Sequence, residues 1–347
     1  MTLSSRSVLV GSVVFLSLLG RSQAASPTNA WTSDFAFLQP WFQVQRNQRE
    51  QLERRGVVVR GLPPSDRQIG VIAACGVVIS PDAFVARILA AGEDKRRESS
   101  AGRFDDPPTL ENLAGLSLDE ADLERLRLCR PSDCRLNLAD HEMSAVQLAL
   151  RTSPRGASPE GQRAFRGVVL DRLRRYLSGG LAALPEYHDR PEPVRPAVIF
   201  SDIIQQTPYL TAHVPAVAAY LERFPFSETD GAESSLLWSK VMMNGKAVVM
   251  VNHLSVFRPK SGPNVPTVLV AGKQVYASRY MNGQLALTML FAGAAGSPSY
   301  LVHVNRSELD ELAGTFSGLK RAVIEGRIKQ EASAALAALR DKLERAE

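Results

Sequence analysis

Apolar and polar positions alternate with a period of two through the last third of the chain, which is the pattern of half-buried strands. The stretch LLWSKVMMNGKAVVMVNHLSVFRP (236–259) contains two such runs on either side of Asn244-Gly245, a dipeptide typical of hairpin turns. Further runs occupy 265–272, 273–291 and 299–305. A second turn is expected at Asn282-Gly283, inside the run 273–291. The pattern predicts about six antiparallel strands that follow one another as a meander.

The N-terminal part combines helical and extended patterns. Residues 40–55 are charged and carry a thin apolar stripe, which is typical of a surface helix. Two β-rich runs, GVVVRG (56–61) and IGVIAACGVVI (69–79), flank a turn. Ser80 as N-cap and Pro81 at the first helical position then begin a second helix. The order predicted here is helix, strand, strand, helix.

The middle of the chain has the period of helices. Helices are predicted at about 117–128, 138–150, 158–177 and 214–224, with Pro-rich linkers at 99–109 and 185–196. The chain is therefore divided into a leader at 1–24, the first part of a core at 25–98, a helical insertion at 99–233 and the rest of the core at 234–347.

A last helix is predicted to begin at SELD (307–310) and to run to the C-terminus. Gly314 and Gly318 have a spacing that lets a helix backbone lie close to a sheet, although the two glycines can equally be a weak point of an exposed helix. The predicted fold class is α+β: an antiparallel β-meander wrapped around a long C-terminal helix, with an inserted all-helical block.

The first 24 residues have the features of an export signal. Arg6 precedes an apolar run at 8–19, and small residues follow at Ser22 and Ala24. The run is shorter than a bilayer requires, and no later stretch has the apolar length of a membrane helix. We expect an exported, periplasmic or secreted protein cleaved near Ala24, with an uncleaved N-terminal anchor as the alternative.

The charge of the chain is nearly balanced. It has 41 basic and 36 acidic residues, and the basic residues lie beside acids, as in RNQREQLERR (46–55). Mixed charge of this kind is typical of solvated helix faces, so no nucleic-acid partner is predicted. A group of arginines on the predicted helix 158–177 can meet an anionic membrane or an acidic partner, or simply face solvent: Arg163, Arg166, Arg172, Arg174 and Arg175.

Three cysteines bear on the compartment. Cys129 and Cys134 flank a Pro-Ser-Asp turn, and in an oxidising compartment such a pair is expected to form a disulfide that clips two helices together. Cys75 is then a buried free thiol, with a bridge from Cys75 to one of the pair as the competing arrangement. His141 begins an H-E-x-x-H pattern, but Ala145 takes the place of the second histidine, so no metal and no cofactor are predicted.

The element order resembles a known superfamily. The phrase VVISPDAF (77–84), the late antiparallel meander and the long C-terminal helix are similar to the START-related helix-grip fold, across roughly 56–92 and 234–345. The resemblance implies a curved sheet around the C-terminal helix that encloses an apolar cavity for a hydrophobic small molecule or lipid. The helical block between the two halves departs from that pattern.

Candidate site residues follow from strand alternation combined with this fold. His253 lies among apolar neighbours, where it can carry a proton or bind a ligand, or serve as a structural histidine. Tyr276, Ser278 and Tyr280 share a face of one strand. The expected ligand-binding residues are Val251, His253, Tyr276, Ser278, Tyr280, Leu287, Met289 and Phe316.

Catalytic signatures are absent from the sequence. It contains no G-x-S-x-G and no phosphate-binding glycine loop. An exported carrier of a hydrophobic ligand is favoured. The alternatives are an enzyme on the same scaffold, with His253 and Tyr276 or Tyr280 at the cavity mouth, and a non-catalytic interaction protein.

Overall fold

The computed structural model describes residues 38, 42–65, 67–97, 101–151, 158–260, 262, 265–292, 299–312 and 317–345. The predicted leader at 1–24, Gly314 and the candidate Phe316 lie outside these residues.

One antiparallel sheet organises the molecule. Its strands are β1 (Val58–Gly61), β2 (Gln68–Val77), β3 (Ala101–Arg103), β4 (Glu233–Met243), β5 (Lys246–Phe257), β6 (Val268–Ala277), β7 (Met281–Phe291) and β8 (Ser299–Leu309). Their order across the sheet is β1-β2-β8-β7-β6-β5-β4-β3. Because β2 pairs with β8 along its whole length, the N-terminal and C-terminal parts of the chain form one continuous sheet.

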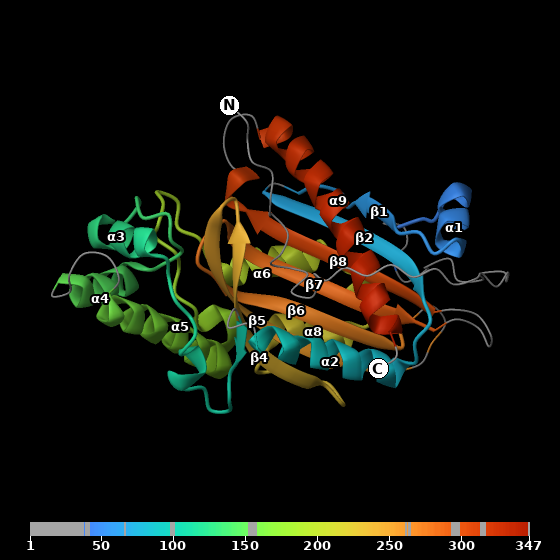
Figure 1. Cartoon of the computed structure of the whole chain (residues 1–347), viewed down its shortest axis with the longest axis horizontal. Coiled ribbons are helices and arrows are strands. Elements are labelled where there is room, and N and C mark those ends of the chain that lie inside the picture. Colours follow the sequence, from blue (N-terminus) through green and yellow to red (C-terminus); the bar gives the residue numbers. More distant parts are fainter. Residues whose placement is uncertain are drawn as a thin grey trace.

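Helices cover both faces of this sheet. They are α1 (Arg46–Glu53), α2 (Pro81–Arg97), α3 (Glu120–Leu128), α4 (Asp140–Arg151), α5 (Pro159–Gly179), α6 (Pro196–Gln205), α7 (Pro208–His213), α8 (Pro215–Arg223) and α9 (Ser317–Glu344), with short 3-10 turns η2 (Glu111–Leu113), η3 (Gly180–Ala183) and η4 (Asp310–Leu312). In Figure 1, α9 and α2 lie in front of the sheet, whereas α6 and α8 lie behind it.

The two faces carry separate hydrophobic cores. Val249 and Val251 of β5 point to the face covered by the inserted helices α3–α8, which we call the insertion face. Val248 and Met250 point to the opposite face, where α2 and α9 pack, which we call the α9 face. Strand alternation therefore divides β5 between two cores, as the apolar character of both its faces predicted.

The predicted fold class is confirmed. The sheet is antiparallel, the last element is the long helix α9, and the helices α3–α8 form a block between β3 and β4. Helices α6 and α7 were not predicted, and both begin at a proline in the first helical position, at Pro196 and Pro208. The short strand β3 lies in a stretch that was predicted to be a linker.

Two predicted boundaries were wrong. Asn282 and Gly283 lie within β7, and the turn comes earlier, at 278–280, where Tyr280 has a φ of 66°. The side chain of Asn137 holds this turn, because its Nδ2 donates to the carbonyl oxygens of Ala277 and Met281 at 2.9 and 3.1 Å. The meander β4–β8 consequently has fewer strands than expected.

The last helix begins later than predicted. The segment 307–310 does not start a helix, since β8 continues to Leu309 and pairs Ser307 with Ile69 of β2. Helix α9 begins at Ser317. A Cβ added to Gly318 would meet nothing within 4 Å, so this glycine does not serve a close approach to the sheet.

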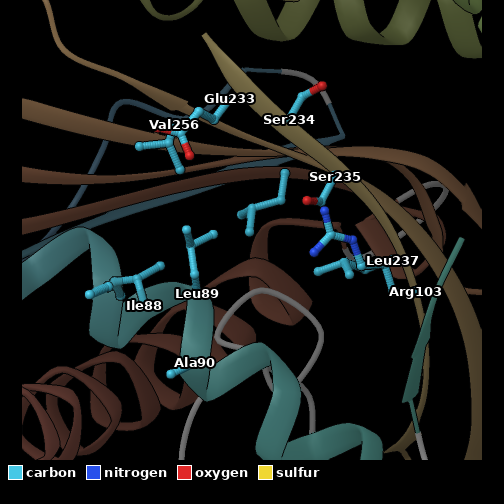
Figure 2. A pocket seen from close by; sticks show the side chains of 11 residues that line it. Ile88, Leu89, Ala90, Arg103, Glu233, Ser234, Ser235, Leu237 and Val256 are labelled. Atoms are coloured by element: carbon cyan, nitrogen blue, oxygen red, sulfur yellow. The ribbon is translucent and has the colours of Figure 1, made fainter. Parts of the chain in front are cut away.

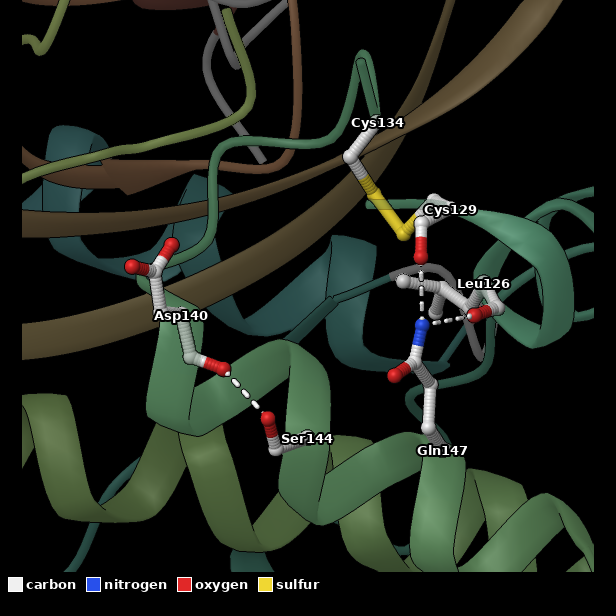
Figure 3. The surroundings of a disulfide bond; sticks show 6 residues. All are labelled: Leu126, Cys129, Cys134, Asp140, Ser144 and Gln147. Carbon is white, nitrogen blue, oxygen red and sulfur yellow. Dashed lines mark hydrogen bonds between the residues drawn. A yellow bond between two sulfur atoms is a disulfide. The ribbon is translucent and has the colours of Figure 1, made fainter. Parts of the chain in front are cut away.

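The disulfide between Cys129 and Cys134 is confirmed, and it closes the turn between α3 and α4 (Figure 3). Gln147 of α4 ties the same turn to the helix, because its Nε2 donates to the carbonyl oxygens of Leu126 at 3.0 Å and Cys129 at 2.7 Å. Cys75 is a buried free thiol on the α9 face, as predicted. Burial raises the pKa of this thiol to about 12, which makes it a poor nucleophile.

Candidate ligand-binding site

His253, the first candidate from the sequence, lies on the insertion face. Its Nδ1 shares a hydrogen bond with the Tyr176 hydroxyl at 2.7 Å, and its ring packs against Phe224 with centroids 4.5 Å apart. Burial, together with the nearby Lys273 ammonium, lowers the pKa of His253 to about 3. The imidazole is therefore neutral at ordinary pH and is held by its neighbours in the manner of a structural histidine.

A buried lysine lies beside it on the same face. Lys273 Nζ donates to the Leu221 carbonyl oxygen at 2.6 Å, and it lies 4.6 Å from the Phe200 ring centroid and 5.1 Å from that of Tyr176. Burial lowers the pKa of Lys273 to about 7. The amine thus joins the C-terminal turn of α8 to the middle of β6.

Tyr276 belongs to a second group on the insertion face. The Arg172 guanidinium lies between two tyrosine rings, with its Cζ 4.8 Å from the Tyr187 centroid and 5.1 Å from the Tyr276 centroid. Arg172 also forms an ion pair with Glu142, and both side chains are buried. This pair joins α4 to α5 underneath the sheet.

The structure does not bring the candidate catalytic side chains together at a cavity mouth. Val251, Leu287 and Met289 pack in the insertion-face core with Tyr276, on the side of the sheet away from α9. Ser278 is fully buried, and its Oγ accepts a hydrogen bond from the Val249 amide at 3.0 Å. Tyr280 lies in the following turn and packs toward the opposite core. A ligand role for these residues in a cavity between the sheet and α9 stays a prediction. The positions of Val251, Tyr276, Leu287 and Met289 on the insertion face argue against that role.

A pocket of about 490 Å³ opens on the α9 face (Figure 2). It lies between helix α2 and the strands β3, β4 and β5, and its lining residues are Ala86, Ile88, Leu89, Ala90, Arg103, Glu233, Ser234, Ser235, Leu237, Leu254 and Val256. Aliphatic side chains from the helix and from the strands face each other across this space. The lining is concave and mixes these aliphatic side chains with polar groups, and concave sites of mixed character bind small molecules in many proteins.

Charged groups stand at two places along the pocket. Arg103 is paired with Leu237 in the sheet and is exposed, whereas Glu233 lies four residues earlier on β4. Figure 2 shows the Arg103 guanidinium beside Ser235 and the Glu233 side chain near Val256. Both charged residues are exposed, as are Ala86 and Ala90, whereas the larger aliphatic residues of the lining are half-buried or buried. The charges therefore lie at the rim, and the larger aliphatic side chains form the interior.

Two residues of the pocket lining, Ser235 and Leu254, belong to a row of residues that crosses the middle of the sheet. The register runs from Ser235 through Leu254, Gly272 and Ala286 to Asn305, and we call these residues the central row. Four of them, all but Asn305, are only half-buried although β5, β6 and β7 are inner strands of the sheet. A Cβ added to Gly272 would meet only Ala286, at 3.9 Å. The described residues therefore leave space open above Gly272 on the α9 face.

Polar side chains flank the central row. Thr288 Oγ1 and His303 Nδ1 share a hydrogen bond at 3.0 Å. Gln284 Nε2 donates to Ser307 Oγ at 3.0 Å, and Ser307 Oγ donates to Asn305 Oδ1 at 3.1 Å. Burial lowers the pKa of His303 to about 4, so that this imidazole is neutral at ordinary pH. The α9 face thus combines small, aliphatic and uncharged polar groups.

The arginines of α5 are engaged in local contacts. Arg166 Nε donates to the Leu116 carbonyl oxygen at 2.7 Å, and Arg174 donates to that of Pro108 at 3.3 Å. Arg175 pairs with Asp171 one turn away at 2.7 Å. Contact of this helix with an anionic membrane stays a prediction.

Neither a metal site nor a membrane span is found in the part of the chain that the structure describes. Its His, Cys, Asp and Glu residues form no group of three or more that could hold a metal ion. None of its helices is both long enough and apolar enough to cross a bilayer.

No protein-family model matches the chain, and no curated protein matches it. The search of solved structures returns a START superfamily protein from Mycobacterium smegmatis, with 15% identity and a TM-score of 0.23. The aligned part covers 31% of this chain and 66% of that chain, just under two thirds of its length. The START-like resemblance stays a prediction from the sequence, whereas the antiparallel sheet and the long C-terminal helix α9 are features of this structure.

The central row was missed in the sequence analysis, although a signal for it exists. Ala286 and Thr288 alternate with Leu285, Leu287 and Met289 on β7, so the sequence of this strand shows which set is small or polar. The larger apolar set was assigned to the cavity because a hydrophobic ligand was expected to meet hydrophobic side chains. The inserted helices cover that set instead.

Proposed function

We propose that the protein binds a hydrophobic small molecule or lipid on the α9 face, in the pocket beneath α2 and along the central row. The observation that carries the proposal is the open space above Gly272 on an inner strand, in register with the pocket residues Leu254 and Ser235. Because these residues are half-buried, solvent reaches this part of the sheet, and the described residues leave room there for a ligand.

The proposed carrier is exported. A disulfide between Cys129 and Cys134 is typical of oxidising compartments, and the first 24 residues have the pattern of a cleaved signal. Mass spectrometry of the chain recovered from an exported fraction tests this part. A mass that begins after Ala24 supports export, and an intact N-terminus contradicts cleavage there.

Binding is tested with N-phenyl-1-naphthylamine, an uncharged probe whose fluorescence rises in apolar surroundings. We expect saturable binding to the wild-type chain and weaker binding to Ala286→Leu, because the added side chain fills the central row. A matched control is Ala271→Leu on the next strand, since Ala271 is fully buried in the insertion-face core.

The two variants separate the faces. The control is expected to lower the midpoint of unfolding and to keep the probe affinity of the molecules that remain folded. If wild type shows no saturable binding, or if only Ala271→Leu weakens it, the proposed site is wrong.

A further inference from the structure

His303 occupies a defined place beside the central row. It lies on β8 in register with Thr288 of β7 and Ala73 of β2, and it is followed two residues later by Asn305 of the central row. Its side chain is 7% exposed. Two residues along a strand span about 7 Å, so a molecule lying over the inner end of the row comes within reach of this ring.

One nitrogen of the ring is held and the other is open. Nδ1 is fixed by Thr288 Oγ1 at 3.0 Å, whereas Nε2 is buried and has no hydrogen-bond partner among the described residues. His303 alternates with Val302 and Val304 of the insertion-face core, so its side chain lies on the α9 face of the sheet. Buried polar atoms without a partner are uncommon because they cost free energy.

His253 shows that burial alone does not leave a ring nitrogen open. This second histidine is as deeply buried, yet its Nδ1 meets the Tyr176 hydroxyl at 2.7 Å and its Nε2 lies 3.4 Å from Ser255 Oγ. The insertion face thus supplies both partners from the protein. Among the described residues, the α9 face supplies a hydrogen-bond partner to only one ring nitrogen of His303.

The surroundings of His303 also restrict the charge of what can bind there. Its strand neighbours on this face are Leu301 and Asn305, and its register partners are Ala73 and Thr288. None of these side chains is charged. An ionised group brought to this place would be buried without an opposite charge, which is costly, whereas a hydroxyl or amide needs only a hydrogen bond.

We propose that His303 Nε2 binds an uncharged hydroxyl or amide group at the inner end of the hydrophobic ligand. The inference rests on the proposed function and narrows its ligand class to neutral amphiphiles, such as long-chain alcohols or amides. A hydroxyl fits either tautomer of the ring, because it both donates and accepts.

The test compares two ligands of similar shape. Dodecan-1-ol and 1-chlorododecane compete with N-phenyl-1-naphthylamine for the wild-type chain and for His303→Leu, and the ratio of their inhibition constants is measured. We expect this ratio to shift about ten-fold against the alcohol in His303→Leu, since one hydrogen bond to a buried group is lost. His303→Gln places an amide near the position of the ring and is expected to restore part of the preference for the alcohol over the chloroalkane.

Two further variants serve as controls. Thr288→Val removes the hydrogen bond that fixes the His303 ring and is expected to weaken the preference for the alcohol while His303 stays in place. This variant keeps the inference testable if His303→Leu does not fold. His253→Gln changes the histidine on the insertion face and is expected to leave the ratio at its wild-type value.

The outcomes distinguish this inference from the function on which it rests. Probe binding with equal ratios in wild type, His303→Leu and Thr288→Val overturns the role of His303 and leaves the binding function standing. A shift in His253→Gln in place of His303→Leu assigns the polar contact to the insertion face. Absence of probe binding to wild type overturns both.

Discussion

The two faces of one sheet differ in what satisfies their side chains. On the insertion face, Lys273 and His253 have partners in the inserted helices, and large residues such as Leu287 are fully buried. On the α9 face, central-strand residues including Ala286 remain half-buried. A helical insertion can thus close one face of an antiparallel sheet as a second core, and the proposed ligand site is then confined to the other face.

The largest expected loss of stability comes from breaking the buried ion pair between Glu142 and Arg172 on the insertion face. Glu142→Gln leaves the buried Arg172 guanidinium without its opposite charge, and we expect the free energy of unfolding to fall by about 3–5 kcal/mol. The control is Asp171→Asn on α5, whose partner Arg175 is about half exposed, with an expected change below about 1 kcal/mol. Urea unfolding measures both. Equal effects would show that Arg172 is accessible to solvent.

Truncation of one leucine on each face tests the packing directly. Leu287→Ala removes a fully buried side chain from the insertion-face core. We expect the free energy of unfolding to fall by about 2–5 kcal/mol, because apolar burial is lost and a cavity is left behind. Leu254→Ala removes a half-buried side chain from the pocket lining, so we expect the free energy of unfolding to fall by about 1 kcal/mol. We also expect weaker probe binding to this variant. A larger loss of stability for Leu254→Ala would contradict the assignment of open and closed faces.

The buried Lys273 on the insertion face is expected to make the stability of the protein depend on pH. Its pKa is about 7 in the folded chain and near its ordinary value of 10.5 in the unfolded chain, so the unfolded state binds more protons between these values. Stability therefore rises with pH across this window, by about 2 kcal/mol from pH 7 to 9. Lys273→Met is expected to flatten the rise in urea unfolding at several pH values. An unchanged slope in this variant would show that the amine is solvated.

The sequence predicted the sheet, α9 and the disulfide because their signals are local. Alternation on β5, the Asn244-Gly245 turn and the short Cys129–Cys134 loop each lie within a few residues. It did not predict the turn at 278–280, because that turn depends on Asn137, far away in the chain.

The candidate site shows the same limit more strongly. Period-two alternation separates two faces, but only tertiary packing decides which one the inserted helices cover. Tyr276 and Leu287 were therefore placed in the cavity on chemical character alone. The register of the sheet was needed to align Gly272 with the pocket residue Leu254 and His303 with Thr288.

Two strand glycines give the smallest expected difference and the most direct comparison of the faces. A Cβ at Gly272 would enter open space on the α9 face, whereas one at Gly283 would lie 2.6 Å from Ile199 of α6 on the insertion face. We expect Gly272→Ala to change the free energy of unfolding by less than about 1 kcal/mol, with a gain as the favoured sign, because alanine restricts the unfolded chain. Gly283→Ala must displace α6, and overpacking of this kind costs about 1–3 kcal/mol. Thermal and urea unfolding of the two variants measure the difference. If Gly272→Ala is the more destabilising, the space above the central row is filled by the protein itself, and the α9 face is as closed as its opposite.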